Sequence, residues 1–288
     1  MLLSVDGGES IMKPFKLASK EYKNDSTVVD ISTARKSIQV GEGHCTIIAG
    51  PCAVESRESY IELAFLLESM GVHMLRGGLF KPRTSPYSFK GLGREGLGIL
   101  MEARELTGLP VVTEIMDVRE LEMMLDGVDV LQVGSRNMQN FSLLEELGKT
   151  QIPILLKRGL SATIEEWLLA AEYMLNLGNP NIILCERGIR TFEPYTRNTV
   201  DIGAVPLIKH LSHLPIIVDP SHATGKWQMV TPVARAAIAA GADGIMVEVH
   251  QEPDRAFSDG KQSLTPEKFN RLFQQVTQIA KLDDKTLK

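Results

Sequence analysis

Short apolar runs alternate with amphipathic segments along the chain from Cys45 onward. The runs are rich in Val, Ile and Leu and are bounded by Gly, Pro or polar residues, a pattern typical of buried parallel strands. Between them, residues 56–71 and 163–178 place apolar side chains at helical spacing, and the second segment opens on Thr163, a favourable N-cap. The pattern predicts eight strands, over residues 45–50, 73–79, 110–115, 128–134, 152–157, 181–186, 215–220 and 243–250.

Eight strand–helix units across residues 45–288 predict an α/β fold, a closed (β/α)8 TIM barrel that forms one catalytic domain. An open doubly wound sheet is the structural alternative. Residues 1–44 do not follow the alternation, and residues 28–32 (VVDIS) are their one plausible strand. We interpret them as a short N-terminal extension. It could cap the bottom of the barrel, supply an edge to a neighbouring subunit or lack a fixed structure.

Composition narrows the possible partners. The 288 residues are 43% hydrophobic, enough for a large core, and their net charge of −5 gives no general attraction for nucleic acid or an anionic membrane. No signal-peptide pattern opens the chain and no run of 18 apolar residues occurs in it, so we expect a cytoplasmic protein. The three cysteines have no paired spacing, and disulfides are not expected.

Four metal-type side chains fall where the predicted strands end. Cys52 follows the first strand, His222 follows the seventh, and Glu248 and Asp259 belong to the end of the eighth and the loop behind it. The active site of a (β/α)8 barrel lies at this rim. A thiolate, an imidazole and two carboxylates suit Mn²⁺, Fe²⁺, Co²⁺ or Zn²⁺ better than Ca²⁺. Taken singly, the four could be a buried apolar group, a hydrogen-bonding histidine, an ion-pair partner and a turn former; their common rim favours the metal site.

Cations gather at the same rim despite the acidic chain. They are Arg76, Lys81, Arg83, Arg136, Lys157 and Arg187. Like charges repel unless a ligand neutralises them, so this arrangement predicts dianionic ligands. For Arg158, Arg190, Arg197 and Lys226 the sequence does not decide between a role in the site and a solvated surface charge.

With these residues in view, the chain resembles 3-deoxy-D-arabino-heptulosonate 7-phosphate (DAHP) synthase of the type I beta branch, the entry enzyme of the shikimate pathway. The resemblance covers about residues 45–280. It is carried by IAGPCAVES, LRGG, KPRTSPYSFKGLG, TEIMD, QVGSRNMQN, LLKRG, ERGIRTFEPYTRNTVD, VDPSHATG, VEVH and SDGKQSL.

The resemblance implies roles for individual residues. Cys52, His222, Glu248 and Asp259 would bind a divalent metal ion, with Cys52 and His222 also among the catalytic residues. Lys81 or Lys157 would donate a proton, and Glu114 would hold a cationic side chain or a water. Phosphoenolpyruvate would bind to Arg76, Lys81, Arg136, Lys157 and Arg187, and the aldose phosphate path would be lined by Lys81, Pro82, Arg83, Thr84 and Ser135.

The implied reaction joins phosphoenolpyruvate to erythrose 4-phosphate, and the implied assembly is a homotetramer. The alternative is the related 3-deoxy-D-manno-octulosonate 8-phosphate synthase, which uses arabinose 5-phosphate. KPRTSPYSF argues against it, because that family carries a KANRSS-like segment there, and Cys52 argues against its metal-independent members, which have Asn. A barrel that binds phosphosugars without catalysis is a third reading. Residues 1–44 are too short for the regulatory modules of some relatives.

Overall fold

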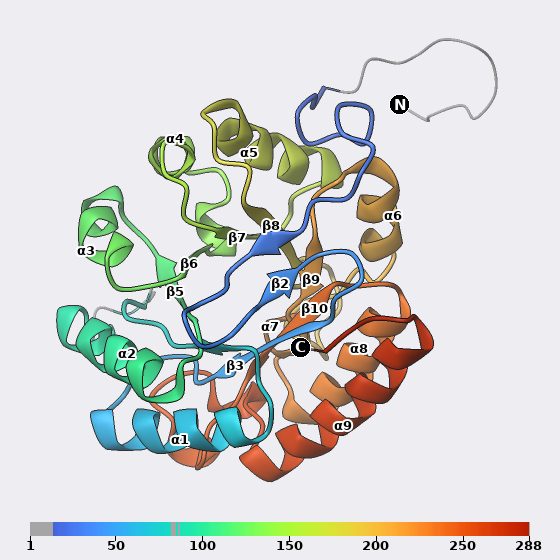
Figure 1. Ribbon diagram of the computed structural model, residues 1–288. Helices are drawn as coiled ribbons and strands as arrows, with labels where there is room; N and C mark the ends of the chain where they lie inside the picture. Colours follow the sequence, from blue (N-terminus) through green and yellow to red (C-terminus); the bar gives the residue numbers. More distant parts are fainter. Residues whose placement is uncertain (1–13, 82–84, 86, 288) are drawn as a thin grey trace.

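The computed structural model describes residues 14–81, 85 and 87–287, and eight of its strands form one closed parallel barrel. The strands follow the order β10-β3-β4-β5-β6-β7-β8-β9, so the last strand pairs with the first and the open-sheet alternative is wrong. Figure 1 shows the helices arranged around the strands. The barrel strands are β3 (Thr46–Gly50), β4 (Met74–Arg76), β5 (Val111–Ile115), β6 (Val130–Val133), β7 (Ile154–Lys157), β8 (Ile182–Glu186), β9 (Ile216–Val218) and β10 (Gly244–Glu248).

Each strand lies inside the run predicted for it and is shorter than that run. The β9 strand ends at Val218 because Pro220 begins a short helix, α7 (Pro220–Thr224). At the end of β3, a side chain on Gly50 would meet the carbonyl oxygen of Arg76 at 2.1 Å. Glycine there lets β3 and β4 approach closely, which places Arg76 at the mouth of the barrel.

The outer helices begin where the sequence places caps. Thr163 caps α5 (Ile164–Asn176) with a capping box, in which Glu166 bonds back to the Thr163 backbone. Ser56 caps α1 (Arg57–Ser69) by accepting from the Ser59 N–H. The other helices are α2 (Arg94–Thr107), α3 (Leu121–Leu125), α4 (Phe141–Gly148), α6 (Ala204–Leu211), α8 (Trp227–Ala239) and α9 (Pro266–Leu282), with 3-10 turns η1 (Val118–Glu120), η2 (Ser135–Asn137), η3 (Pro253–Arg255) and η4 (Gly260–Gln262).

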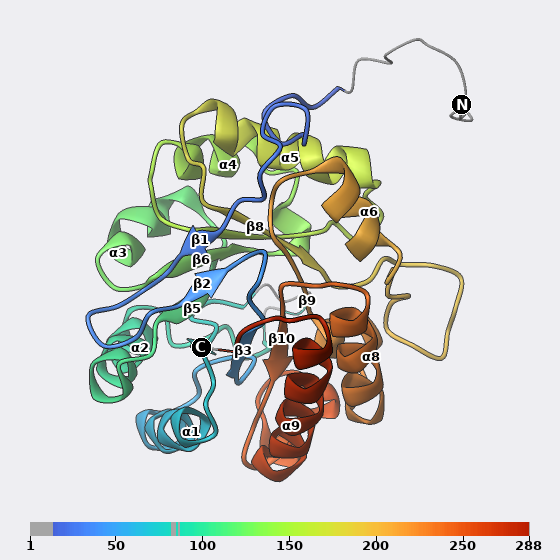
Figure 2. The same cartoon turned by 45° about the vertical axis from the view of Figure 1, so that its right-hand side comes forward.

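The extension closes the bottom of the barrel. Its strands β1 (Val29–Asp30) and β2 (Gln39–Val40) form an antiparallel hairpin that lies across the barrel opening in Figures 1 and 2. Apolar side chains of this hairpin pack with the inward-facing residues of the strands, Ile48 and Met246 among them. The carboxylate of Glu172 on α5 accepts the backbone N–H groups of residues 16–18 at 2.7–2.9 Å. The cap is therefore the alternative that the structure shows.

None of the helices in the described part of the chain is both long and apolar enough to cross a membrane.

Candidate metal and anion site

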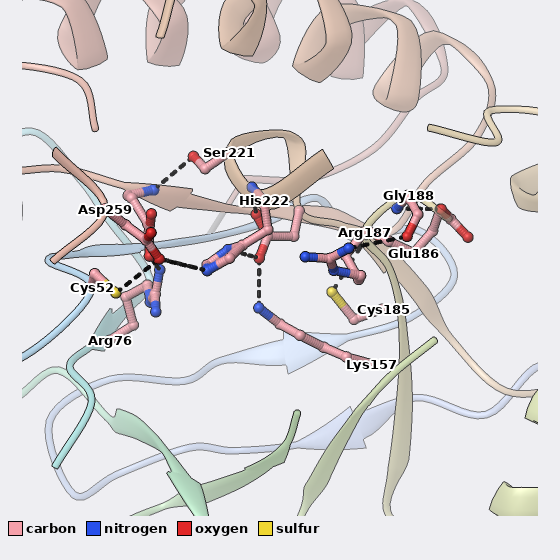
Figure 3. Close-up of polar contacts among 12 residues, drawn as sticks. Cys52, Arg76, Lys157, Cys185, Glu186, Arg187, Gly188, Ser221, His222 and Asp259 are labelled. Carbon is pink, nitrogen blue, oxygen red and sulfur yellow. Dashed lines mark hydrogen bonds and ion pairs between the residues drawn. The ribbon is translucent and has the colours of Figure 1, made fainter. Parts of the chain in front are cut away.

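Four side chains converge at the carboxyl end of the barrel. They come from the loop after β3 (Cys52), from α7 (His222), from the end of β10 (Glu248) and from the β10–α9 loop (Asp259), and their ligand atoms all lie within 4.8 Å of one another. The Cys52 thiol donates to Asp259 Oδ2 at 3.3 Å. Figure 3 shows Cys52, His222 and Asp259 pointing toward one another with Arg76 beside them. The structure thus brings together all four residues of the predicted metal set.

A buried carboxylate fixes the orientation of His222. Asp219 Oδ2 lies 2.7 Å from His222 Nδ1, and Asp219 Oδ1 accepts the His222 backbone N–H at 2.9 Å. Burial opposes ionisation of Asp219, but His222 and Lys157 outweigh it and hold the pKa of this carboxyl well below its usual range. An ionised Asp219 selects the tautomer that carries the proton on Nδ1. The lone pair of Nε2 then faces the other members of the group.

The protonation states of the group match a cation site. Burial lowers the pKa of His222, although Asp219 and Glu248 oppose the shift, and this favours the neutral imidazole that binds metal ions. The Nε2 atom of His222 faces Glu248 Oε1 at 3.3 Å and Asp259 Oδ2 at 3.7 Å. Burial opposes ionisation of both carboxyls, but His222, with Arg76 at one and Arg197 at the other, keeps each pKa below its ordinary value. One imidazole nitrogen and two carboxylates thus lie close together, a set of donor atoms that a divalent ion would stabilise.

The thiol completes the donor set. Cys52 is 4% exposed. Burial, then the nearby Glu248, raises the pKa of the Cys52 thiol to about 12. A thiolate therefore needs an added positive charge at this place, and a metal ion supplies one. The residues present fit a first-row divalent ion with sulfur, nitrogen and oxygen ligands.

Cations line the rest of the same pocket. Two of them are ion-paired with buried carboxylates: Arg76 Nη1 lies 2.7 Å from Glu248 Oε1, and Lys157 Nζ lies 2.5 Å from Asp219 Oδ2. For Arg136, Arg187 and Arg190 no carboxylate partner occurs among the described residues. The cations that line the pocket are Arg76, Lys81, Arg136, Lys157, Arg187, Arg190 and Arg197. This excess of positive charge can hold more than one anionic group.

The four basic residues that the sequence left undecided separate clearly. Arg190 and Arg197 line the pocket. Arg158 instead makes a buried ion pair with Glu186 and reaches Asp201, both at 3.0 Å, and so supports the loops around the site. Lys226 borders a second cavity, beside Trp227.

The remaining predicted residues are placed less completely. Glu114 and Ser135 line the pocket, and no ion pair of Glu114 occurs among the described residues. A side chain on Gly134 would overlap the Glu114 carboxylate, 2.0 Å from its Oε1, so a larger residue after β6 would displace this carboxylate. Pro82, Arg83 and Thr84 lie outside the described residues.

Several further residues of the site are not evident from the sequence pattern. Asp219 lies in the same DPSH motif as His222, three residues before it, and Asn198 donates to the His222 carbonyl at 2.9 Å. Gln262 contacts both Glu248 and Arg197. Asp219 could have been found by its position at the end of a strand, whereas Gln262 is brought to the site by the path of the long β10–α9 loop.

Comparison with known proteins places the chain in a family. Residues 23–283 match the model of the DAHP synthetase I family. Phospho-2-dehydro-3-deoxyheptonate aldolase of Thermotoga maritima is 54% identical over 280 residues, which are 96% of this chain and 82% of the relative. A 2-dehydro-3-deoxyphosphooctonate aldolase of Syntrophobacter fumaroxidans is 31% identical over 84% of this chain and 90% of its own length.

Solved structures agree with the sequence relatives. The crystal structure of Phospho-2-dehydro-3-deoxyheptonate aldolase (DAHP synthase) from Thermotoga maritima has a TM-score of 0.92 at 52% identity and covers 96% of this chain and 80% of the other. A truncated form of 3-deoxy-D-arabino-heptulosonate 7-phosphate synthase from the same organism has a TM-score of 0.88 at 49% identity, over 94% and 98% of the two chains. The resemblance found in the sequence motifs is confirmed, and the chain belongs to the DAHP synthetase I family.

Proposed function

We propose that this protein condenses phosphoenolpyruvate with erythrose 4-phosphate and water, forming 3-deoxy-D-arabino-heptulosonate 7-phosphate and phosphate, the first step of the shikimate pathway. The observation that carries the proposal is one pocket that combines the Cys52–His222–Glu248–Asp259 group with seven cations. Neither half alone specifies the reaction. Together they suit two phosphorylated substrates, of which one has an aldehyde to be activated.

The reaction needs the two substrates to be held in line. In it, C3 of phosphoenolpyruvate bonds to the aldehyde carbon, and the aldehyde oxygen takes a proton. Water adds at C2, and phosphate leaves when the bond between C2 and its bridging oxygen breaks. We assign phosphoenolpyruvate to Arg76, Arg136, Lys157, Arg187 and Lys81, with the last reaching toward the aldose. Positioning of this kind contributes roughly 7–11 kcal/mol to catalysis.

The metal group supplies the second element of catalysis. Cys52, His222, Glu248 and Asp259 would hold the ion, with Mn²⁺, Fe²⁺, Co²⁺ and Zn²⁺ as candidates. When bound there, such an ion acts as a Lewis acid that polarises the aldehyde oxygen. The chain itself prepares the place: Asp219 orients His222, and Arg76 holds one Glu248 oxygen at 2.7 Å.

Two lysines are candidates for the proton donor. The Lys157 ammonium is bound by the buried carboxylate of Asp219 at 2.5 Å, which suits a fixed anion-binding charge. Lys81 is 9% exposed and has no ion-pair partner among the described residues. Its positive charge lies close enough to Cys52 and Asp259 to act against a higher pKa at both. We therefore assign proton transfer to Lys81 and substrate binding to Lys157.

The identity of the aldose phosphate substrate separates the proposed function from a second candidate, 3-deoxy-D-manno-octulosonate 8-phosphate synthesis. Relatives named 2-dehydro-3-deoxyphosphooctonate aldolase share 29–31% identity, against 54% for the heptonate aldolase. The experiment is to compare kcat/KM for erythrose 4-phosphate and arabinose 5-phosphate with saturating phosphoenolpyruvate and Mn²⁺. We expect erythrose 4-phosphate to be preferred by at least about tenfold, the scale of one lost pocket contact. A preference for arabinose 5-phosphate would assign the protein to the other reaction, and no turnover of either would favour a non-catalytic phosphosugar-binding barrel.

Assembly, location and domain division are separate parts of the proposal. We propose a cytoplasmic homotetramer in which residues 1–44 form the extension and residues 45–288 the catalytic barrel. Light scattering coupled to size-exclusion chromatography measures the oligomeric state directly.

A further inference from the structure

The side chain of Gln262 lies between Glu248, a member of the metal-type group, and Arg197, which contacts a second member, Asp259. Gln262 ends η4 in the β10–α9 loop, three residues after Asp259, and is 2% exposed. Its Nε2 donates to Glu248 Oε2 at 2.6 Å, and its Oε1 accepts from Arg197 Nη1 at 2.9 Å. A buried amide with both ends hydrogen-bonded is fixed in one orientation.

The contacts of Gln262 continue on both sides. The other oxygen of Glu248 accepts from Arg76 at 2.7 Å, so this carboxylate is held at both oxygens. Arg197 Nη1, which donates to Gln262, also lies 3.4 Å from Asp259 Oδ1. One side chain therefore bridges the environment of Glu248, from the barrel wall, and that of Asp259, from a loop.

The chemistry of the two partners selects an amide of this length. A carboxylate accepts hydrogen bonds and a guanidinium donates them, so the bridging side chain must offer one donor and one acceptor. Methionine has nearly the same shape but offers neither. Asparagine has both groups but is one methylene shorter and does not span the two partners.

We propose that Gln262 is a positioning residue of the metal site, which fixes the Glu248 carboxylate directly and the Asp259 carboxylate through Arg197. The inference rests on the proposed function, because it assumes that the four-residue group binds a metal ion. In this role Gln262 acts through Glu248 and Arg197 and is not itself a ligand of the ion. Partners that orient metal ligands typically contribute about 10–100-fold to affinity.

The test is a Co²⁺ titration of the full-length, metal-free protein. Binding is monitored through the thiolate-to-cobalt charge-transfer absorption and the ligand-field bands. For Gln262→Met we expect the Kd for Co²⁺ to rise by about 10–100-fold and the ligand-field bands to shift, because Glu248 loses its fixed orientation. The melting temperature of each metal-free variant, recorded alongside, separates a change at the site from a loss of fold.

Gln251→Met is the matched control. Gln251 lies in the same loop and is also hydrogen-bonded, but its Nε2 donates at 2.7 Å to the carbonyl of Ser59 in α1 and touches none of the four ligands. We expect its Co²⁺ affinity and spectrum to equal those of the unmodified protein. If Gln262→Met also keeps an unchanged Kd and spectrum, or if Gln251→Met loses affinity equally, the positioning role is wrong.

A second variant keeps the test informative if Gln262→Met folds poorly. Gln262→Asn retains a polar side chain and should fold, yet we expect it to weaken Co²⁺ binding by at least about tenfold because it cannot reach both partners. Unchanged affinity in folded Gln262→Asn overturns the inference. Failure of the proposed metal site has a different signature, since the unmodified protein would then show no thiolate-to-cobalt band at all.

Discussion

At the scale of single residues, hydrogen-bond partners decide what each side chain of the pocket can do. Cys52 and Cys45 are both buried cysteines near β3, and burial raises both thiol pKa values to about 12. Cys52 alone faces an imidazole nitrogen and two carboxylates. Its surroundings, and not its residue type, make it a candidate ligand.

Replacing Cys52 by Ala should remove the metal and keep the fold. The change deletes one of four donors, so we expect the metal content after Mn²⁺ or Zn²⁺ loading to fall to less than about a tenth, while the circular dichroism spectrum stays the same. Cys45→Ala is the matched control and should retain full metal content. Equal stoichiometry in the two variants would exclude Cys52 as a ligand.

His73 should make the folded protein less stable in acid. Its Nδ1 accepts the Ile47 N–H at 2.9 Å, and burial lowers its pKa from 6.5 to about 4, with Lys36 assisting the shift. The neutral form is favoured in the fold, so this contribution is complete above pH 6.5 and is lost as pH falls toward 4. Lowering the pH from 7 to 5 should cost about 2 kcal/mol through this group alone.

Urea unfolding of the protein and of His73→Gln at both pH values measures that effect. Glutamine can still accept from Ile47 but does not titrate in this range, so the variant should show the smaller loss on acidification. Because the other titrating groups are common to both proteins, the difference isolates His73. Equal losses in the two proteins would show that its pKa is not shifted.

The residues that lie at the site were predictable from the strand ends, but their ion-pair and hydrogen-bond partners were not. Cys52, His222 and Glu248 follow strands that the apolar runs mark, so the barrel rule places them at one rim. Arg158 and Lys157 are neighbours at the same strand end, yet one pairs with Glu186 and the other points into the pocket. This difference follows from side-chain direction and from loops far apart in the sequence, and a local pattern does not contain it.

At the scale of elements, the hairpin β1–β2 covers the end of the barrel at which the strands begin. Strands β3–β10 leave apolar side chains at their amino ends, and Val29, Ile31, Ile38 and Val40 cover them. The barrel runs were predictable because buried parallel strands are almost uninterrupted in apolar residues. The docking of the hairpin was not predictable, because its strands have two residues each and its apolar positions match a surface that exists only after the barrel closes.

Shortening a side chain of this cap should destabilise the whole domain. Ile38 is 2% exposed, and for Ile38→Ala we expect a loss of about 2–5 kcal/mol in the free energy of unfolding. Val28→Ala, at a position 41% exposed beside β1, should change stability by no more than about 0.5 kcal/mol. Chemical denaturation measures both, and equal stability of the two variants would mean that the cap is not part of the core.

At the scale of the whole molecule, charge is separated by place. The chain carries a net charge of −5, yet seven cations line the pocket at the carboxyl end of the barrel. An acidic exterior with a cationic mouth directs small anions to that mouth, where the low-dielectric walls strengthen their binding. The phosphorylated substrates proposed for this protein are anions of the kind that such a charge distribution attracts. The relatives at 54% and 31% identity are named for a heptonate and an octonate product, respectively.

One pocket is expected to use its metal group and its cations together. The most direct measurement is phosphate release by the purified protein from phosphoenolpyruvate and erythrose 4-phosphate, before and after treatment with a chelator. We predict turnover by the metal-loaded protein, its loss after chelation and its return on addition of Mn²⁺. Undiminished phosphate release after complete removal of metal would show that the metal group is not needed, and no release from the metal-loaded protein would show that the pocket does not catalyse this reaction.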